Sequence, residues 1–140
     1  MPIFDHFSIL APFYDRAIRL KEPERFGKMA NLPVDGALLD VGGGTGRVSY
    51  ALREKAHPLV VADVSYGMLR QAKEKDGLQT VCSHSECLPF MDNSFERIIM
   101  VDALHHVCDN QETAQEIWRV LKPGGRVVIE EPDIRTLIVK

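Results

Sequence analysis

The sequence predicts an α/β domain built around a doubly wound parallel sheet. Short apolar runs alternate along the chain with longer segments of helical periodicity, and a cluster of glycines directly follows the first run. Strands that alternate with helices form parallel sheets covered on both faces, and right-handed crossovers then lead to the doubly wound topology. A length of 140 residues, with 45% hydrophobic and 26% charged residues, suits one globular domain.

The N-terminal region is expected to form two helices ahead of the sheet. Apolar residues recur at three- and four-residue steps between residues 4 and 20, which is the spacing of one helical face. Pro23 can begin a second, shorter helix that runs to about Met29. Within one domain spanning 1–140, we therefore expect N-terminal helices at 1–31, a core at 37–131 and a tail at 132–140.

Five apolar runs are the expected strands, and helices fill the intervals between them. Ser65 is placed to cap the helix that follows the second strand. The strands are expected at residues 38–41, 58–63, 78–82, 97–101 and 126–131, with helices at 47–55 and 65–75 between them.

The last helix begins with a capping signal, because Asp109 and Glu112 have the spacing of a capping box. The sequence Pro123-Gly124-Gly125 is expected to end this helix. Its core face should carry Ala114, Ile117, Trp118 and Leu121.

Charge and composition exclude several classes of partner. The net charge is −3 and the lysines and arginines are scattered, whereas a domain that binds a phosphate backbone usually carries a basic face. No apolar run reaches the roughly 20 residues that a membrane span needs. The N-terminal residues also lack the pattern of a secretory signal. We therefore expect neither nucleic acid nor a membrane span.

The three cysteines, Cys82, Cys87 and Cys108, indicate reduced thiols. An odd number without a secretory signal predicts a cytoplasmic location. Cys82 is expected to be buried in a strand as a small hydrophobic residue. The Cys-x-His-x-x-Cys spacing around His84 is not that of a compact zinc site, so we predict no metal.

The glycine-rich segment from Asp40 to Gly46 is the strongest functional signal, because it joins a strand to a helix. Glycines allow a sharp turn and a close approach of a ligand to the backbone. A phosphate-binding loop would need a lysine after it, and a dinucleotide loop would need glycine at the position of Arg47. The remaining pattern, Asp-x-Gly-x-Gly-x-Gly, is met. A tight turn that binds nothing is the alternative.

Asp63 ends the second strand about twenty residues after the glycine loop. A carboxylate there can accept hydrogen bonds from both hydroxyls of a ribose. Alternatively, it can help to cap the helix that starts after Ser65. Because the acid and the glycine loop occur together at this spacing, the sequence favours the ribose.

Five segments, in order and covering nearly the whole chain, carry a family resemblance. They are Leu39–Gly46; Asp63-Val64-Ser65 with Met68-Leu69 and Ala72; Glu86-Cys87-Leu88-Pro89-Phe90 followed by Asp92-Asn93-Ser94-Phe95-Glu96; Ala103-Leu104-His105-His106-Val107; and Arg119–Gly125. Together they resemble the class I S-adenosylmethionine-dependent methyltransferases, above all the small-molecule subgroup that includes quinone-biosynthesis C-methyltransferases. The resemblance implies a Rossmann-like fold with strand order 3-2-1-4-5. It also implies that the last two of the family's seven strands are missing from this chain.

The resemblance also implies a set of residues around S-adenosylmethionine and its product S-adenosylhomocysteine. Relatives often have Gly-Asp-Ala-Glu where this chain has Ser83-His84-Ser85-Glu86, so recognition of the adenine should differ here. The methionine end is expected at Tyr14, Asp40, Gly42, Gly43, Gly44 and Gly46; the ribose and adenine at Asp63, Val64, Met68, His84, Ser85 and Glu86; and the sulfonium at Met100 and Val101.

A methyl group on a sulfonium is electrophilic, so catalysis consists mainly of alignment and exclusion of water. A general base is needed only if the acceptor loses a proton, and His105 is the expected candidate because it follows the fourth strand.

The segment Val101–Leu104 lacks the Asn/Asp-Pro-Pro pattern of base and amide methyltransferases, which favours a small, apolar acceptor. A nicotinamide-dependent oxidoreductase and a cofactor-binding core without activity of its own are the alternatives. An uncovered edge of the fifth strand predicts either a longer gene product or a homo-oligomer that covers this edge.

Overall fold

The computed structural model describes residues 23–131. The predicted helix at 4–20, with Tyr14, and the predicted tail at 132–140 lie outside the described residues. None of the described helices is long and apolar enough to cross a membrane.

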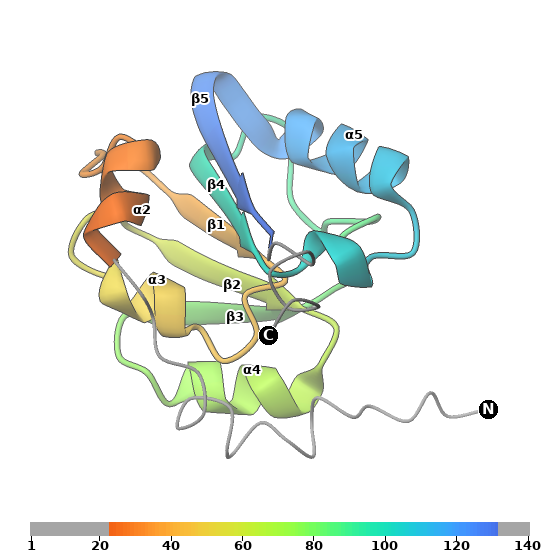
Figure 1. Cartoon of the computed structure of the whole chain (residues 1–140), viewed down its shortest axis with the longest axis horizontal. Coiled ribbons are helices and arrows are strands. Elements are labelled where there is room, and N and C mark those ends of the chain that lie inside the picture. Colours follow the sequence, from red (N-terminus) through yellow and green to blue (C-terminus); the bar gives the residue numbers. More distant parts are fainter. Residues whose placement is uncertain (1–22, 132–140) are drawn as a thin grey trace, which may run out of the picture.

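The described residues form a five-stranded parallel sheet with the order β3-β2-β1-β4-β5 (Figure 1). This confirms the predicted doubly wound topology. All four residues of β1 are buried, because the strand lies between β2 and β4 and is covered on both faces. The strands are β1 (Leu38–Val41), β2 (Leu59–Asp63), β3 (Leu78–Cys82), β4 (Phe95–Val101) and β5 (Leu121–Glu130).

Helices cover both faces of this sheet. The helical elements are α2 (Pro23–Met29), α3 (Arg47–Ala51), α4 (Tyr66–Lys73), the 3-10 turn η1 (Leu104–His106) and α5 (Asn110–Val120). Ile117 and Val120 of α5 pack with Leu39 on one face, whereas α2, α3 and α4 pack on the other. Alternate residues of β1 therefore serve different layers.

The predicted caps are present at both long helices. The Ser65 hydroxyl accepts a hydrogen bond from the Met68 N–H at 3.3 Å, and the Asp109 carboxylate accepts one from the Glu112 N–H at 2.9 Å. Each satisfies a backbone donor in the first turn, which has no partner within its own helix. These contacts set where α4 and α5 begin.

Two predictions about burial are wrong. Trp118 is 80% exposed and Ala114 is also exposed, because the core face of α5 consists instead of Thr113, Ile117 and Val120. Cys82 is exposed because β3 is the outermost strand on its side of the sheet.

The largest differences between predicted and observed element boundaries are at α3 and β5. The helix α3 ends at Ala51, four residues earlier than predicted. The strand β5 begins at Leu121 rather than Arg126, directly after α5, and its pairing with β4 is irregular between Phe95 and Arg97. The Pro-Gly-Gly segment thus lies within the irregular start of β5.

Candidate functional site

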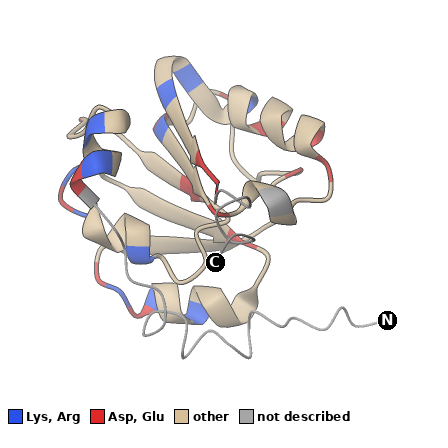
Figure 2. Ribbon diagram, in the orientation of Figure 1, with Lys and Arg blue, Asp and Glu red and all other residues tan. Residues whose placement is uncertain are grey.

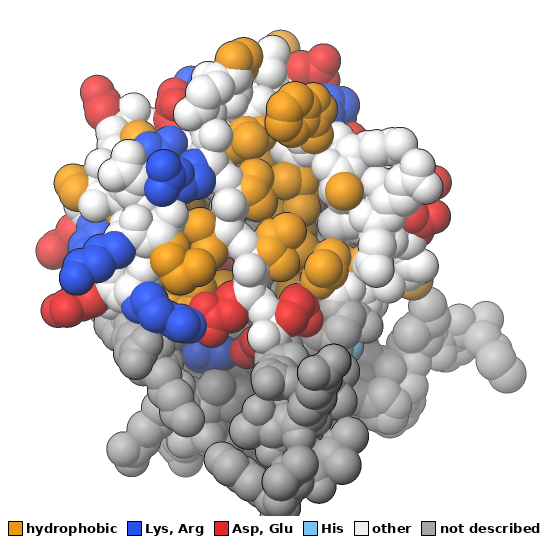
Figure 3. Space-filling view, turned by 45° about the horizontal axis from the view of Figure 1, so that its top comes forward, with side chains coloured by type: hydrophobic (Ala, Val, Ile, Leu, Met, Phe, Trp, Pro, Cys, Tyr) orange, Lys and Arg blue, Asp and Glu red, His pale blue; other side chains and the backbone are white. Residues whose placement is uncertain are grey.

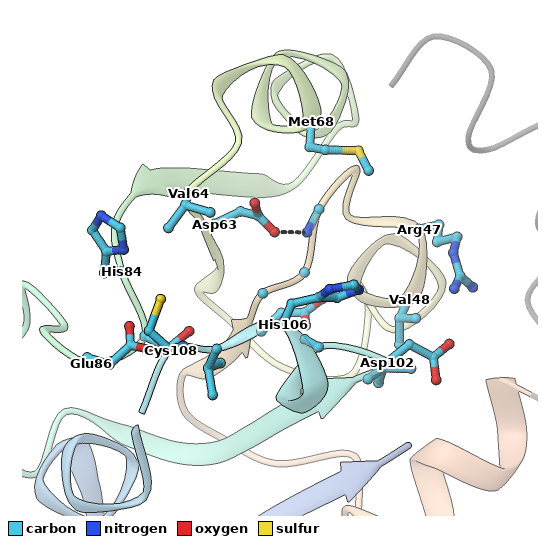
Figure 4. Close-up of a pocket in the computed structure, with 18 residues that line it drawn as sticks. Arg47, Val48, Asp63, Val64, Met68, His84, Glu86, Asp102, His106 and Cys108 are labelled. Atoms are coloured by element: carbon cyan, nitrogen blue, oxygen red, sulfur yellow. Dashed lines mark hydrogen bonds between the residues drawn. The ribbon is translucent and has the colours of Figure 1, made fainter. Parts of the chain in front are cut away.

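A cavity of about 290 Å³ opens at the carboxyl ends of β1, β2 and β4 (Figure 4). The chain order of the sheet reverses at β1, and such a switch point is where open α/β sheets bind ligands. Its walls are formed by Asp40, Gly42, Gly43, Gly44, Arg47, Val48, Asp63, Val64, Met68, His84, Ser85, Glu86, Val101, Asp102, Ala103, His106, Val107 and Cys108.

The glycine loop forms one wall through its backbone. The N–H groups of Gly42 and Gly43 donate to the carbonyl of Ala62 in β2, at 2.7 and 3.3 Å. Gly44 has a φ of +58°, and a Cβ there would have no neighbour closer than 3.9 Å. The space beside Gly44 is thus open toward the cavity, and a side chain would partly fill it.

The other glycines of the loop have different roles. A Cβ on Gly43 would lie 2.5 Å from Cγ of Asp40, so this glycine makes room for a buried acid. A Cβ on Gly46 would lie 2.7 Å from the Leu78 side chain, which belongs to the core. Gly46 is not part of the cavity wall, and it permits close packing of the loop against the sheet.

Asp63 lies in the middle of the cavity and holds two backbone groups. Its Oδ2 accepts from the Gly44 N–H at 2.9 Å (Figure 4), and its Oδ1 accepts from the Ser65 N–H at 2.8 Å. A carboxylate has about four acceptor positions, so one side chain can hold both backbone groups at once. The structure therefore includes the expected link to the start of α4 and adds one to the glycine loop.

Asp40 is a buried acid at the base of the loop. Its carboxylate is 1% exposed and accepts a hydrogen bond from the Ser49 hydroxyl at 2.8 Å. Burial raises the pKa of Asp40 to about 7, and the negative charge of Asp63 adds to this increase. The Ser49 hydrogen bond and the positive charge of Arg47 act in the opposite direction.

The opposite wall is held in place by side chains. Glu86 Oε1 accepts from the backbone N–H groups of Cys108 and Asp109, at 2.7 and 3.1 Å. Burial alone would raise the Glu86 pKa, but these hydrogen bonds and the charge of His84 outweigh it, and the pKa is lowered. Glu86 thus connects the loop after β3 to the start of α5.

A second contact holds the same loop to α5. The Glu116 carboxylate accepts from the Leu88 N–H at 2.9 Å. The Arg119 guanidinium donates to the carbonyls of Leu88 and Phe90, at 2.9 and 2.7 Å, and to the Asp92 carboxylate at 2.9 Å. The wall therefore depends on residues about thirty positions away in the sequence.

The end of β4 differs from expectation at Met100. Met100 is fully buried in the core and does not line the cavity, whereas Val101 does. The His105 side chain lies outside the described part of the structure, and the cavity is lined by its neighbour His106. Asp102 has a φ of +53° and its N–H donates to the Glu130 carbonyl at 2.8 Å, so this turn is anchored to β5.

Sequence reasoning missed Arg47, Val48, Asp102, Ala103, His106, Val107 and Cys108 as parts of the cavity wall. Arg47 had a signal, because it directly follows the last glycine of the loop. Val107 and Cys108 had none, because their position depends on the contact between Glu86 and the start of α5.

Comparison with protein families gives a match to the methyltransferase domain over residues 39–129. Among curated proteins, the chain is 35% identical over 105 residues to the ubiquinone/menaquinone biosynthesis C-methyltransferase UbiE of Legionella pneumophila (strain Paris). It is 38% identical over 104 residues to the demethylmenaquinone methyltransferase of Clavibacter sepedonicus. The matches cover 68% and 71% of this chain, which spans about 42% of the length of each relative.

Solved structures give the same result. The YcgJ protein of Bacillus subtilis superimposes with a TM-score of 0.72 at 27% identity, over 76% of this chain and 48% of that one. A Haloferax volcanii methyltransferase, solved with the Trm112 methyltransferase activator, superimposes with a TM-score of 0.73 at 27% identity, over 89% and 59%. The family match covers more than half of the chain and confirms the resemblance seen in its motifs. The chain therefore belongs to the methyltransferase domain family.

Proposed function

We propose that this chain forms the S-adenosylmethionine-binding part of a methyltransferase whose acceptor is a small, apolar molecule. The open space beside Gly44, next to the Asp63 carboxylate at the switch point of the sheet, carries this proposal. A methyl side chain there would enter the cavity without meeting protein, which is the geometry that a ligand lying against the backbone requires.

The residues along the cavity fit the parts of this cofactor. We propose that Asp63, which lies between the glycine loop and Val64, accepts hydrogen bonds from the ribose. Val64 is 54% exposed and offers an apolar surface to the adenine, and Met68 also lines the cavity (Figure 4). His84 and Ser85 are proposed to bind the adenine edge.

Charge supports a cationic ligand. The cavity wall contains the carboxylates of Asp63, Glu86 and Asp102, and Asp40, whose pKa is raised to about 7, adds a partial negative charge near neutral pH. An acidic cavity favours a positively charged sulfonium. We propose that Glu86 contributes by holding the wall in place, because its Oε1 is bound to two backbone N–H groups.

The bound cofactor supplies an electrophilic methyl group, and the chain's own residues position it and exclude water. Val101, Ala103 and Val107 form an apolar part of the wall at the end of β4, which suits an apolar acceptor. The names of the curated relatives refer to quinone biosynthesis, so we propose a quinone-like ring. His105 stays the predicted base for an acceptor that must lose a proton, and its neighbour His106 lines the cavity.

Three further expectations remain proposals. Figure 2 shows lysines and arginines spread over several elements, which supports the absence of a nucleic-acid partner.

Figure 3 shows hydrophobic side chains on the face toward β5, where Ile129 is 46% exposed on an edge strand. We propose that this edge pairs with a second copy, which light scattering over a range of concentrations would test. The cytoplasmic location is proposed from the free thiols of the three cysteines.

Calorimetric titration tests the proposed function. We expect S-adenosylmethionine and S-adenosylhomocysteine to bind and NAD not to bind, because Arg47 occupies the position where a dinucleotide loop needs glycine. Binding of NAD without binding of S-adenosylhomocysteine would favour the oxidoreductase instead.

A further inference from the structure

Arg47 is the only lysine or arginine among the described residues that line the cavity. It is the first residue of α3 and directly follows Gly46, so the glycine loop fixes the position of its backbone. The residue is partly buried. A guanidinium in an otherwise acidic wall can complement an anionic group of a ligand.

The position of Arg47 along the cavity identifies that part. Figure 4 shows Arg47 at the end opposite His84 and Glu86, with Asp63 between them. If Asp63 binds the ribose and the loop of His84 faces the adenine, Arg47 lies at the end that receives the amino-acid part of the cofactor.

The charges at this end match those of a free amino acid. Asp40 lies at the base of the glycine loop, held by Ser49, and the charge of Arg47 acts on its carboxylate. An α-amino acid carries a carboxylate and an ammonium on one carbon. The guanidinium of Arg47 complements the carboxylate of such a group, and the Asp40 carboxyl group can accept a hydrogen bond from its ammonium.

We propose that Arg47 binds the α-carboxylate of the cofactor's methionine end and thereby selects ligands that carry an amino-acid group. This inference rests on the proposed function. A guanidinium presents paired N–H donors that fit a carboxylate in a bidentate manner, which a lysine cannot reproduce. Arg47 is thus a binding residue at one end of the ligand, distant from the adenine.

The competing explanation is that Arg47 only offsets the negative charge of Asp40. In that case, removing the guanidinium would weaken every ligand of the cavity to a similar extent, because the effect would reach the ligand through the shape or stability of the loop. The two explanations therefore differ in how the loss depends on the chemistry of the ligand.

The test compares two ligands by calorimetry, using the full-length protein. S-adenosylhomocysteine carries the amino-acid group, and 5′-methylthioadenosine has the same base, ribose and thioether without it. In Arg47→Met, we expect affinity for S-adenosylhomocysteine to fall about 10- to 100-fold, as for a lost hydrogen bond to a charged group. Affinity for methylthioadenosine should stay within about 2-fold of the unmodified protein.

Two further variants serve as controls. Arg47→Lys keeps the charge but loses the paired donors, so it should give an intermediate affinity for S-adenosylhomocysteine. Arg70→Met removes the same charge from an exposed position in the last turn of α4, outside the cavity, and should change neither affinity. Thermal unfolding of each variant shows whether the fold is intact.

The outcomes separate the two proposals. A loss confined to S-adenosylhomocysteine supports the inference. An equal loss for both ligands, or no loss for either, overturns the role of Arg47 while leaving the proposed function in place. If the unmodified protein binds neither ligand, the proposed function fails and the inference fails with it.

Discussion

The two walls of the cavity are built in different ways. The glycine loop follows a fully buried strand, and backbone hydrogen bonds to Ala62 hold it against β2. The opposite wall, the loop from Ser83 to Ser94, is held by Glu86, Glu116 and Arg119 through contacts to distant parts of the chain. Replacements in the first wall should therefore lower both the stability of the fold and the affinity for the ligand. Replacements in the second wall should mainly lower ligand affinity.

The largest expected effect is the pH dependence that arises from Asp40. Its pKa rises from 3.8 to about 7 in the folded chain, so the folded state binds more protons than the unfolded state between these values. Stability from this group is therefore highest below about pH 4, decreases as the pH rises to about 7, and is constant above. At about 1.4 kcal/mol for each pKa unit, the decrease amounts to roughly 4 kcal/mol.

Asp40→Asn should remove this decrease, because an amide does not titrate. Urea unfolding of both proteins from pH 4 to pH 8 measures it, and the difference in unfolding free energy between them should change steadily with pH. Parallel curves would show that Asp40 is ionised throughout, and that the first wall does not contain a neutral acid.

Asp63→Ala should weaken S-adenosylhomocysteine binding by about 1.5–3 kcal/mol, the range for hydrogen bonds to a charged group. It should also lower stability, because the N–H groups of Gly44 and Ser65 lose their acceptor. Calorimetry and thermal unfolding measure the two effects separately. Asp76→Ala, at an exposed position, is the matched control. Loss of stability with unchanged affinity would assign Asp63 to the loop and the α4 cap alone.

Gly43 and Gly44 are adjacent and separate the two roles of the first wall. Gly43→Ala should destabilise the fold by about 1–3 kcal/mol, as for overpacking, because the new Cβ meets the buried Asp40. Gly44→Ala should cost about 1–2 kcal/mol for its left-handed backbone. Its Cβ enters open space, so the main loss is of cofactor affinity. If both variants lose stability and affinity equally, the space beside Gly44 is not a ligand site.

The smallest expected effect lies in the second wall. Glu86→Ala should reduce cofactor affinity by about 1 kcal/mol, because the loop is no longer fixed to the N–H groups of Cys108 and Asp109. Glu86→Gln keeps an acceptor oxygen and should lose less. Amide hydrogen exchange at Cys108 and Asp109 should speed up in the alanine variant, with Glu54→Gln, an exposed acid outside the cavity, as control. Unchanged exchange would mean that Glu86 does not hold this wall.

The same contrast explains how far the sequence could predict the molecule. The order of the sheet, the strand Leu38–Val41 and the caps at Ser65 and Asp109 follow from local patterns, because short-range hydrogen bonds and burial determine them. The buried face of α5 does not follow from local patterns. Trp118 was expected on the core face, but it is exposed and Thr113 is buried, because the side of the helix that meets the sheet decides which residues are covered.

The cavity shows the same division. Motif spacing identified Asp40, Gly44 and Asp63, which lie close together because the adjacent parallel strands β1 and β2 end at the same edge of the sheet. Val107 and Cys108 became part of the wall only through the tertiary contact of Glu86. Met100 alternates with Val101 along β4, and a one-residue difference decides which of them points into the core.

The central claim is that S-adenosylmethionine and its product bind in this cavity, across both walls. Amide chemical-shift mapping with S-adenosylhomocysteine tests it most directly. We expect the largest shifts at Gly42–Gly44, Val64 and Ser85, with little change at Gly36 and Gly77, which precede β1 and β3 at the other end of the sheet. Shifts concentrated at Gly36 and Gly77, or an unchanged glycine loop at saturating ligand, would contradict it.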